Sequence, residues 1–131
     1  MNNKLINWNT KVNRVVVIAD DREEILEVLK IKLTLRGWKT ICVKSIRELD
    51  ETLKYIDVCA VIMDGDFGYY GQNTGLKMVK KHGQGIPFFA NSGDERWNKQ
   101  MVEAGAIEII GKPNADRLDL FFEDLTEKGG K

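Results

Sequence analysis

Polar side chains suited to phosphoryl transfer stand where separate apolar runs of this chain end. They are Asp20 and Asp21 after the run 15–19, Asp64 after 60–63, Ser92 after 88–91, and Lys112 after 109–111. If the runs are neighbouring parallel strands, these side chains meet in one pocket, because ligand sites in open α/β sheets lie at the carboxyl ends of the strands. Three carboxylates and one ammonium group leave two negative charges, which a single Mg²⁺ would neutralise. The spacing therefore predicts a magnesium-dependent phosphoryl-transfer site.

The elements that would position these side chains alternate along the chain. Short β-branched runs predict strands, at 14–19, 38–43, 58–63, 86–91 and 107–110. Amphipathic segments predict helices, at about 22–36, 45–55, 75–82, 94–104 and 115–127. Five strands that alternate with five helices predict an α/β fold, with one parallel sheet doubly wound by helices on both faces. The run 38–43 is more mixed than the nearly continuous apolar runs, which suits an edge strand.

Local signals support the first two helices. Apolar residues recur at three- and four-residue spacing in the first of them, at Ile25, Val28, Leu29 and Leu33. Gly37 stands where the C-terminal cap of that helix is expected. Ser45 and Glu48 have the spacing of a capping box at the start of the second helix.

Composition indicates one globular domain, because the chain has 131 residues, of which 43% are hydrophobic and 31% charged. We expect a polar lead-in at 1–13, the domain at 14–127 and a loose tail at 128–131. The net charge is zero, so neither nucleic acid nor an anionic membrane is an expected partner. The sequence has no run as long as a membrane span and no signal peptide, so the cytoplasm is the expected location. Cys42 and Cys59 lie in apolar stretches and are predicted to be buried small apolar residues.

The ordered set of strand-end residues resembles the receiver domain of two-component response regulators, of which the CheY-like stand-alone type is the simplest. The resemblance covers about 14–127 and includes Lys112-Pro113, which matches a Lys-Pro pair of that family. It implies a flavodoxin-like (βα)5 fold with the five parallel strands in the order 2-1-3-4-5. It also implies that Asp64 is the phospho-acceptor, and that the protein is a signalling receiver and not an enzyme acting on a separate substrate.

The resemblance assigns further roles around Asp64. The implied Mg²⁺ ligands are Asp21 and Asp64 directly, Asp20 directly or through water, and the backbone carbonyl of Asp66. Lys112 would pair with the phosphoryl oxygens, and the Ser92 hydroxyl would hydrogen-bond one of them. The implied donor is a phosphohistidine on a sensor histidine kinase or a histidine phosphotransfer protein. An unknown downstream protein would receive the signal, and the receiver itself would be a monomer or a weak homodimer.

The only histidine, His82, follows two lysines at a helix end and lies far in sequence from the pocket. We expect it to be solvated or to contact the C-terminal end of the helix dipole.

Some positions depart from the family's pattern. Ile109 stands where the family usually has an aromatic residue whose rotamer follows phosphorylation. The loop after Asp64 is longer than usual and rich in glycine, and it carries Tyr69 and Tyr70. These two tyrosines are either ordinary surface residues or part of a loop that docks a partner.

Acidic residues near the pocket suggest a second variation. Asp66 and Asp94 lie two residues after Asp64 and Ser92, at positions that tune dephosphorylation in the family. Trp97, early in the fourth predicted helix, either faces a partner surface or packs in the core.

Two other functions fit parts of the pattern. Asp64-Gly65-Asp66 after a strand resembles the paired aspartates of haloacid-dehalogenase-type phosphohydrolases, although the chain is short for a cap domain and its other acids come first. An interaction module with a vestigial pocket, a pseudo-receiver, also fits, since Ile109 and the loop are unusual. Each strand-end residue also has a local explanation: a helix cap and first-turn acid for Asp20-Asp21, a turn residue for Asp64, a helix cap for Ser92 and a surface charge for Lys112.

Overall fold

The computed structural model describes residues 14–67 and 72–110. Its strands are β1 (Val15–Ala19), β2 (Lys39–Val43), β3 (Ala60–Met63), β4 (Phe88–Ala90) and β5 (Glu108–Ile109). Its helices are α2 (Glu23–Leu35), α3 (Ile46–Tyr55), α4 (Thr74–His82) and α5 (Glu95–Glu103). Every strand and helix expected within these residues is present. The lead-in, the last predicted helix at 115–127 and the tail lie outside the described residues.

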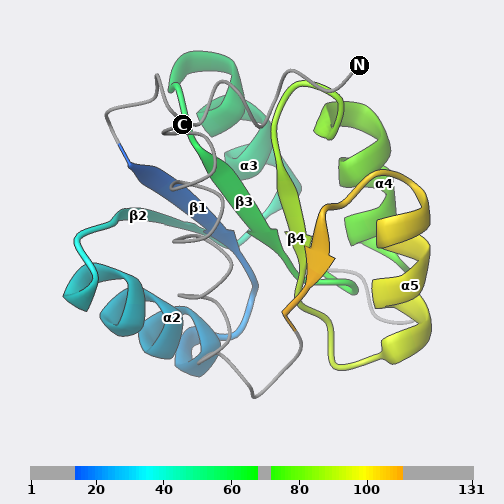
Figure 1. The fold of residues 1–131 in the computed structure, drawn as a ribbon, viewed down its shortest axis with the longest axis horizontal. Coiled ribbons are helices and arrows are strands. Elements are labelled where there is room, and N and C mark those ends of the chain that lie inside the picture. The colour runs from blue at the N-terminus through cyan, green and yellow to red at the C-terminus, as the bar shows by residue number, and fades with distance from the viewer. Residues whose placement is uncertain (1–13, 68–71, 111–131) are drawn as a thin grey trace, which may run out of the picture.

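All five strands form one sheet in the order β2-β1-β3-β4-β5. Each neighbouring pair is parallel, so the helices between them are crossover connections. This order confirms the predicted doubly wound, flavodoxin-like α/β fold (Figure 1). It also places β1, β3 and β4 inside the sheet, where their nearly continuous apolar sequences are buried on both faces.

Alternate side chains of each central strand point to opposite faces of the sheet. Val16 and Ile18 of β1 pack on one face with α2, which contributes the buried residues Leu26, Leu29 and Leu33. This arrangement places α2 alone against that face among the described helices (Figure 1).

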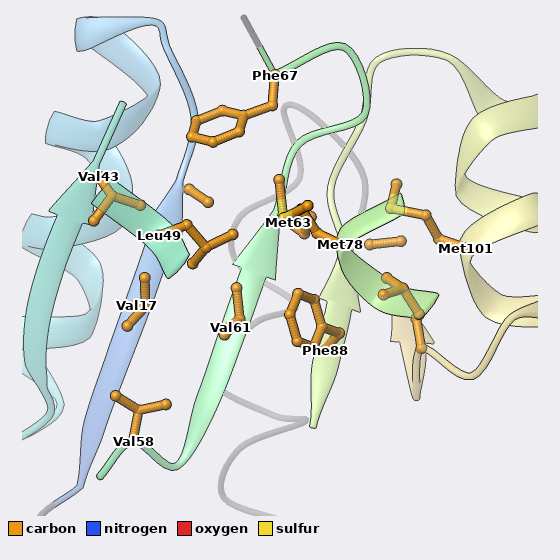
Figure 2. Packing of buried hydrophobic residues seen from close by; sticks show 14 residues of the cluster. Val17, Val43, Leu49, Val58, Val61, Met63, Phe67, Met78, Phe88 and Met101 are labelled. Carbon is orange, nitrogen blue, oxygen red and sulfur yellow. The ribbon is translucent and has the colours of Figure 1, made fainter. Parts of the chain in front are cut away.

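The other face of the sheet is covered by α3, α4 and α5. Each of these helices contributes a large side chain to the same cluster: Leu49 from α3, Met78 from α4 and Met101 from α5. Figure 2 shows these side chains along the sheet, with Phe67 beyond the end of β3. Phe67 is fully buried, so the segment that follows Asp64 is anchored in the core before the chain turns toward α4.

Capping hydrogen bonds fix the ends of the first two helices. The Gly37 N–H donates to Thr34 O and the Trp38 N–H donates to Leu33 O, both at 3.0 Å, which is the Schellman pattern. Gly37 has a φ of +87°, a conformation that favours glycine, so the predicted cap is confirmed. At the start of α3, the Glu48 N–H donates to Ser45 Oγ at 3.2 Å. The Glu48 carboxylate accepts from the Lys44 N–H and not from Ser45, so the capping box is shifted by one residue.

Two predicted core residues prove to be exposed. Val28 is 46% exposed, because the buried face of α2 is formed by Leu26, Leu29 and Leu33. Cys42 is exposed because β2 is the edge strand, whereas Cys59 is buried as predicted. Partial desolvation still raises the pKa of the Cys42 thiol, and the neighbouring Glu27 adds to this rise.

Within the described residues, none of the helices has the length and apolar character needed to cross a bilayer.

Candidate functional site

The sheet positions the residues that follow its central strands. The Asp20 N–H donates to the last carbonyl of β2 at 3.2 Å, and the Asp64 N–H donates to the last carbonyl of β1 at 3.0 Å. The Asn91 N–H donates in the same way to the last carbonyl of β3 at 2.9 Å. The ladder therefore extends one residue past each strand, and the backbone that carries Asp20 and Asp64 is fixed by neighbouring strands.

Three carboxylates meet at this edge. One oxygen from each of Asp20, Asp21 and Asp64 lies within 4.8 Å of the other two. Asp20 and Asp64 are each only 1% exposed, and Asp21 is half-buried. We refer to these residues as the acidic cluster. The prediction that the residues after β1 and β3 come together is therefore confirmed for these carboxylates.

The acidic cluster fits a magnesium ion by the chemistry of its donors. Mg²⁺ takes oxygen ligands at about 2.1 Å, so ligands on opposite sides of the ion are about 4.2 Å apart. The observed limit of 4.8 Å is close to that spacing and needs only a small adjustment of the side chains. Mg²⁺ retains several waters, so a set of only two or three carboxylates is the kind of site it uses.

The Asp20-Asp21 pair does not cap the helix that follows it. The N-cap of α2 is Arg22, whose side chain makes no capping hydrogen bond. Asp20 Oδ1 instead accepts from the Arg22 N–H at 2.9 Å, in a short turn that holds one oxygen of this buried carboxylate in place. The local explanation of the pair as a simple helix cap is therefore wrong.

Gly65 brings the chain next to Asp64 into contact with the end of β4. A β-carbon at Gly65 would lie 2.6 Å from Ser92 Oγ and 2.8 Å from Trp97 Cε3. Only a residue without a side chain allows this approach. The Ser92 hydroxyl, predicted from the sequence, therefore lies against the residue next to the acidic cluster. Trp97, whose position the sequence left open, is half-buried against the same glycine.

Gly75, in the first turn of α4, makes a second close approach. Its N–H donates to Gly65 O at 2.8 Å, and a β-carbon there would lie 2.4 Å from the backbone oxygen of Asp64. The main chain around Asp64 is thus held between α4 on one side and the β4–α5 connection on the other.

Ser92 is held by a buried asparagine that the sequence did not single out. The Ser92 N–H donates to Asn98 Oδ1 at 2.8 Å, and Asn98 Nδ2 donates to Ser92 O at 2.9 Å. Ser92 Oγ accepts from the Asp94 N–H at 3.0 Å. Ser92 and Asn98 are 4% and 2% exposed, so this network is shielded from water.

Asp94 caps α5. Its side chain accepts from the Arg96 N–H at 2.9 Å and forms an ion pair with the Arg96 guanidinium, with Nη2–Oδ2 at 2.8 Å. The hydrogen bonds from Arg96 lower the pKa of the Asp94 carboxyl. This carboxylate is engaged with its own helix, and the predicted roles of Asp66 and Asp94 in dephosphorylation stay predictions. Asp66 is half-buried.

Asn73 is the other site residue that sequence reasoning missed. Its Oδ1 accepts from the Leu76 N–H at 3.1 Å as the N-cap of α4. Its Nδ2 donates to Trp97 O at 3.3 Å and to Gln100 Oε1 at 2.9 Å, so it joins α4 to α5. A preferred N-cap residue just before an apolar periodic segment was the available signal. No such signal exists for Asn98, because an asparagine inside a helix usually points to solvent.

Other predicted residues lie elsewhere or outside the description. Ile109 is half-buried on β5 and pairs with Ala90 of β4. Lys112, Tyr69 and Tyr70 lie outside the described residues, so their predicted roles stay predictions.

His82 is not simply a solvated helix end. Its Nε2 lies 2.7 Å from Asp50 Oδ1, its ring stacks near Phe88, and Lys81 pairs with the other Asp50 oxygen at 3.0 Å. Asp50, Lys81 and His82, with Leu53 and Lys54, line a cavity of about 370 Å³ between α3 and α4, at the opposite end of α4 from Gly75. Desolvation acts to raise the pKa of Asp50, but hydrogen bonds from His82 and Lys81 outweigh it and leave this pKa below its usual value.

The sequence matches no protein-family model and no curated protein. Solved structures are similar over nearly all of the chain. The receiver domain of a Francisella response regulator has a TM-score of 0.74 and 20% identity, covering 88% of this chain and 98% of that one. A response regulator from Thermotoga maritima has a TM-score of 0.72 and 19% identity, with 88% and 99% covered. A CheY-like receiver domain protein from Methanospirillum hungatei has a TM-score of 0.73 and 21% identity, with 88% and 95% covered. Together with the strand order, these matches establish that the chain has the CheY-like receiver fold of response regulators.

Proposed function

We propose that the protein is a phospho-accepting receiver that takes a phosphoryl group onto Asp64 and passes the signal on by protein contact. The observation that carries this proposal is the acidic cluster, in which Asp20 and Asp21 from the end of β1 meet Asp64 from the end of β3 within 4.8 Å. Three carboxylates at this distance repel one another, and a bound divalent cation would offset that repulsion. A site that binds Mg²⁺ and a phosphoryl group gives this arrangement a use.

The proposed donor is a phosphohistidine on a sensor histidine kinase or a histidine phosphotransfer protein. An oxygen of the Asp64 carboxylate attacks phosphorus, and an O–P bond forms while the P–N bond of the donor breaks. The electron pair of that bond stays on the imidazole nitrogen, which takes up a proton, and the product is an aspartyl phosphate. Because little other covalent chemistry is needed, the protein contributes mostly positioning and electrostatic stabilisation.

The acidic cluster and the backbone carbonyl of Asp66 would hold the ion, which when bound neutralises charge on the phosphoryl oxygens. The buried backbone of Asp64 and its hydrogen bond to β1 orient the carboxylate for attack. Ser92 and Lys112 would donate hydrogen bonds to the phosphoryl oxygens once the bond has formed. Asp66 would influence the attack of water on the aspartyl phosphate and so set the lifetime of the signal.

The protein acts on itself in this proposal and turns over no separate substrate. Partner contact would involve the loop that carries Tyr69 and Tyr70, together with Trp97. Monomeric protein or a weak homodimer would serve this role.

Intact-mass measurement after incubation with acetyl phosphate and Mg²⁺ tests the proposal. We expect one phosphoryl group per chain, absent in Asp64→Ala and present in the control variant Asp57→Ala, which changes an exposed carboxylate away from the cluster. A beryllium fluoride adduct detected by a change in Trp fluorescence should show the same dependence on Asp64. No adduct by either method would contradict the proposal and favour a pseudo-receiver. Continuous hydrolysis of a generic phosphomonoester would instead favour a phosphohydrolase.

A further inference from the structure

The side chain of Asn98, in α5, hydrogen-bonds to both the backbone N–H and the backbone carbonyl of Ser92. Its side-chain oxygen accepts from the Ser92 N–H at 2.8 Å, and its side-chain nitrogen donates to the Ser92 carbonyl at 2.9 Å. Asparagine is a poor helix former, and burial of an amide is unfavourable unless its polar atoms are hydrogen-bonded. Here the amide is 2% exposed and both of its polar atoms have a partner on the same residue. Ser92 therefore cannot shift relative to α5 without breaking two buried hydrogen bonds.

Ser92 also lies close to the residue that follows Asp64, so a group added to Asp64 would come near it. Gly65, the next residue after Asp64, is so close to Ser92 that an added β-carbon would lie 2.6 Å from its Oγ. Ser92 Oγ already accepts from the Asp94 N–H at 3.0 Å, which leaves its proton to donate. A phosphoryl group on Asp64 would bring strong acceptor oxygens next to this donor. A shift of Ser92 toward the phosphoryl group would then displace α5, because Asn98 of α5 is hydrogen-bonded to Ser92.

The first turns of α5 carry this link to the surface of the protein. Trp97, one residue before Asn98, packs its ring against Gly65. The Trp97 carbonyl and the Gln100 side chain accept from Asn73 Nδ2, so α4 is attached to the same unit. Ile109, at the position expected for an aromatic switch residue, has no polar atom that could hydrogen-bond to Ser92.

We propose that Asn98 is a positioning residue that makes Ser92 and α5 move as one body, so that α5 reports whether Asp64 is modified. The inference rests on the proposed acceptor role of Asp64. It assigns the transmission of the signal from Asp64 to the two hydrogen bonds between Asn98 and Ser92, which we call the clamp. No aromatic residue at position 109 is needed for this route. The surface that changes is then the part of α5 around Trp97, together with the start of α4.

Amide hydrogen exchange with and without the beryllium fluoride adduct tests this proposal, with adduct occupancy checked in every sample. In the wild type, exchange rates across Glu95–Glu103 should change by about fivefold or more, the lower end of usual coupling effects. In Asn98→Leu, which has a similar size but no hydrogen-bonding group, Asp64 should still be modified while the change in α5 falls below about twofold. Asn98→Asp keeps the acceptor for the Ser92 N–H and should show an intermediate response. Lys99→Ala, on the exposed face of the same turn, should respond as the wild type does.

The outcomes separate the two proposals. If Asp64 is modified in both proteins and α5 responds equally in Asn98→Leu, the clamp is refuted and the acceptor role stands. If the wild type is modified and α5 does not respond at all, the clamp is refuted as well. If the wild type takes no adduct, the acceptor role fails and the clamp falls with it. Should Asn98→Leu fold poorly, Asn98→Asp decides, because a full wild-type response in that variant would overturn the requirement for both hydrogen bonds.

Discussion

Gly75→Ala is predicted to destabilise the protein, against the usual sign of a glycine-to-alanine change in a helix. Alanine is normally favoured over glycine in a helix by about 1 kcal/mol. At this position the new β-carbon would lie 2.4 Å from the Asp64 backbone oxygen and 2.7 Å from Met101 Sδ. Met101 Sδ lies on a flexible side chain, but the carbonyl belongs to Asp64, the residue after β3, whose N–H donates to Ala19 O of β1. The helix itself must therefore move.

The size of the effect follows from opposing contributions. Overpacking against fixed backbone costs about 1–3 kcal/mol. The 2.8 Å bond from the Gly75 N–H to Gly65 O is stretched by the same movement, and loss of such a bond costs about 1 kcal/mol. After the gain in helix propensity is subtracted, the expected net loss is about 2 kcal/mol. With a urea m-value of about 2 kcal/mol/M, the unfolding midpoint should fall by about 1 M.

Urea unfolding followed by far-UV circular dichroism measures this change. Gly93→Ala is the matched control, because a β-carbon there meets nothing within 4 Å, and its stability should equal or slightly exceed that of the wild type. If Gly75→Ala proves as stable as Gly93→Ala, the close contact between α4 and the Asp64 backbone is refuted. The acceptor reaction of Gly75→Ala should also be slower than that of the control, because the displaced helix shifts the Asp64 main chain.

Four further predictions test separate parts of the structure. Mg²⁺ at ten times its dissociation constant should stabilise the wild type by about 1.4 kcal/mol in thermal unfolding, and Asp21→Asn should lose most of this effect. Asp64→Asn should likewise gain less stability from Mg²⁺ than the wild type, because one of the three carboxylate ligands loses its charge; an undiminished gain would contradict the place of Asp64 in the metal site. The pKa of Asp50 is lowered in the folded protein, so the stability that its carboxylate contributes is fully present above the unfolded pKa of about 4 and is lost as pH falls through the lower folded value. Asp50→Asn should therefore lack this loss of stability in urea titrations between about pH 2 and 5. A thiol reagent should modify Cys42 in the native protein and Cys59 only after unfolding, and Cys42→Ser should therefore show no native labelling.

The strand ends were predictable because each central run is apolar on both faces and stops at a polar residue. In a parallel sheet such a stop is also the edge where side chains gather, so Asp20 and Asp64 followed from sequence alone. Helix faces were less predictable. In α2 more positions are apolar than one face can bury, and the packing of Leu26 against the sheet leaves Val28 exposed. The pairing of His82 with Asp50 depends on the distance between α3 and α4, which no local pattern encodes.

The acidic cluster was visible in the sequence because its chemistry resides in side chains, whereas its supports are largely backbone contacts. Gly65 and Gly75 act through the absence of a side chain, and Asn98 acts on the peptide groups of Ser92. Such contacts depend on positions within a few tenths of an ångström, and packed interiors transmit displacements of this size because they contain few voids. A change in bonding at Asp64 therefore reaches α4 through Gly75 and reaches α5 through the Ser92 loop. Since Asn73, at the start of α4, also donates to Trp97 O and Gln100 Oε1 of α5, we expect the two helices to respond together, without a rotating aromatic on β5.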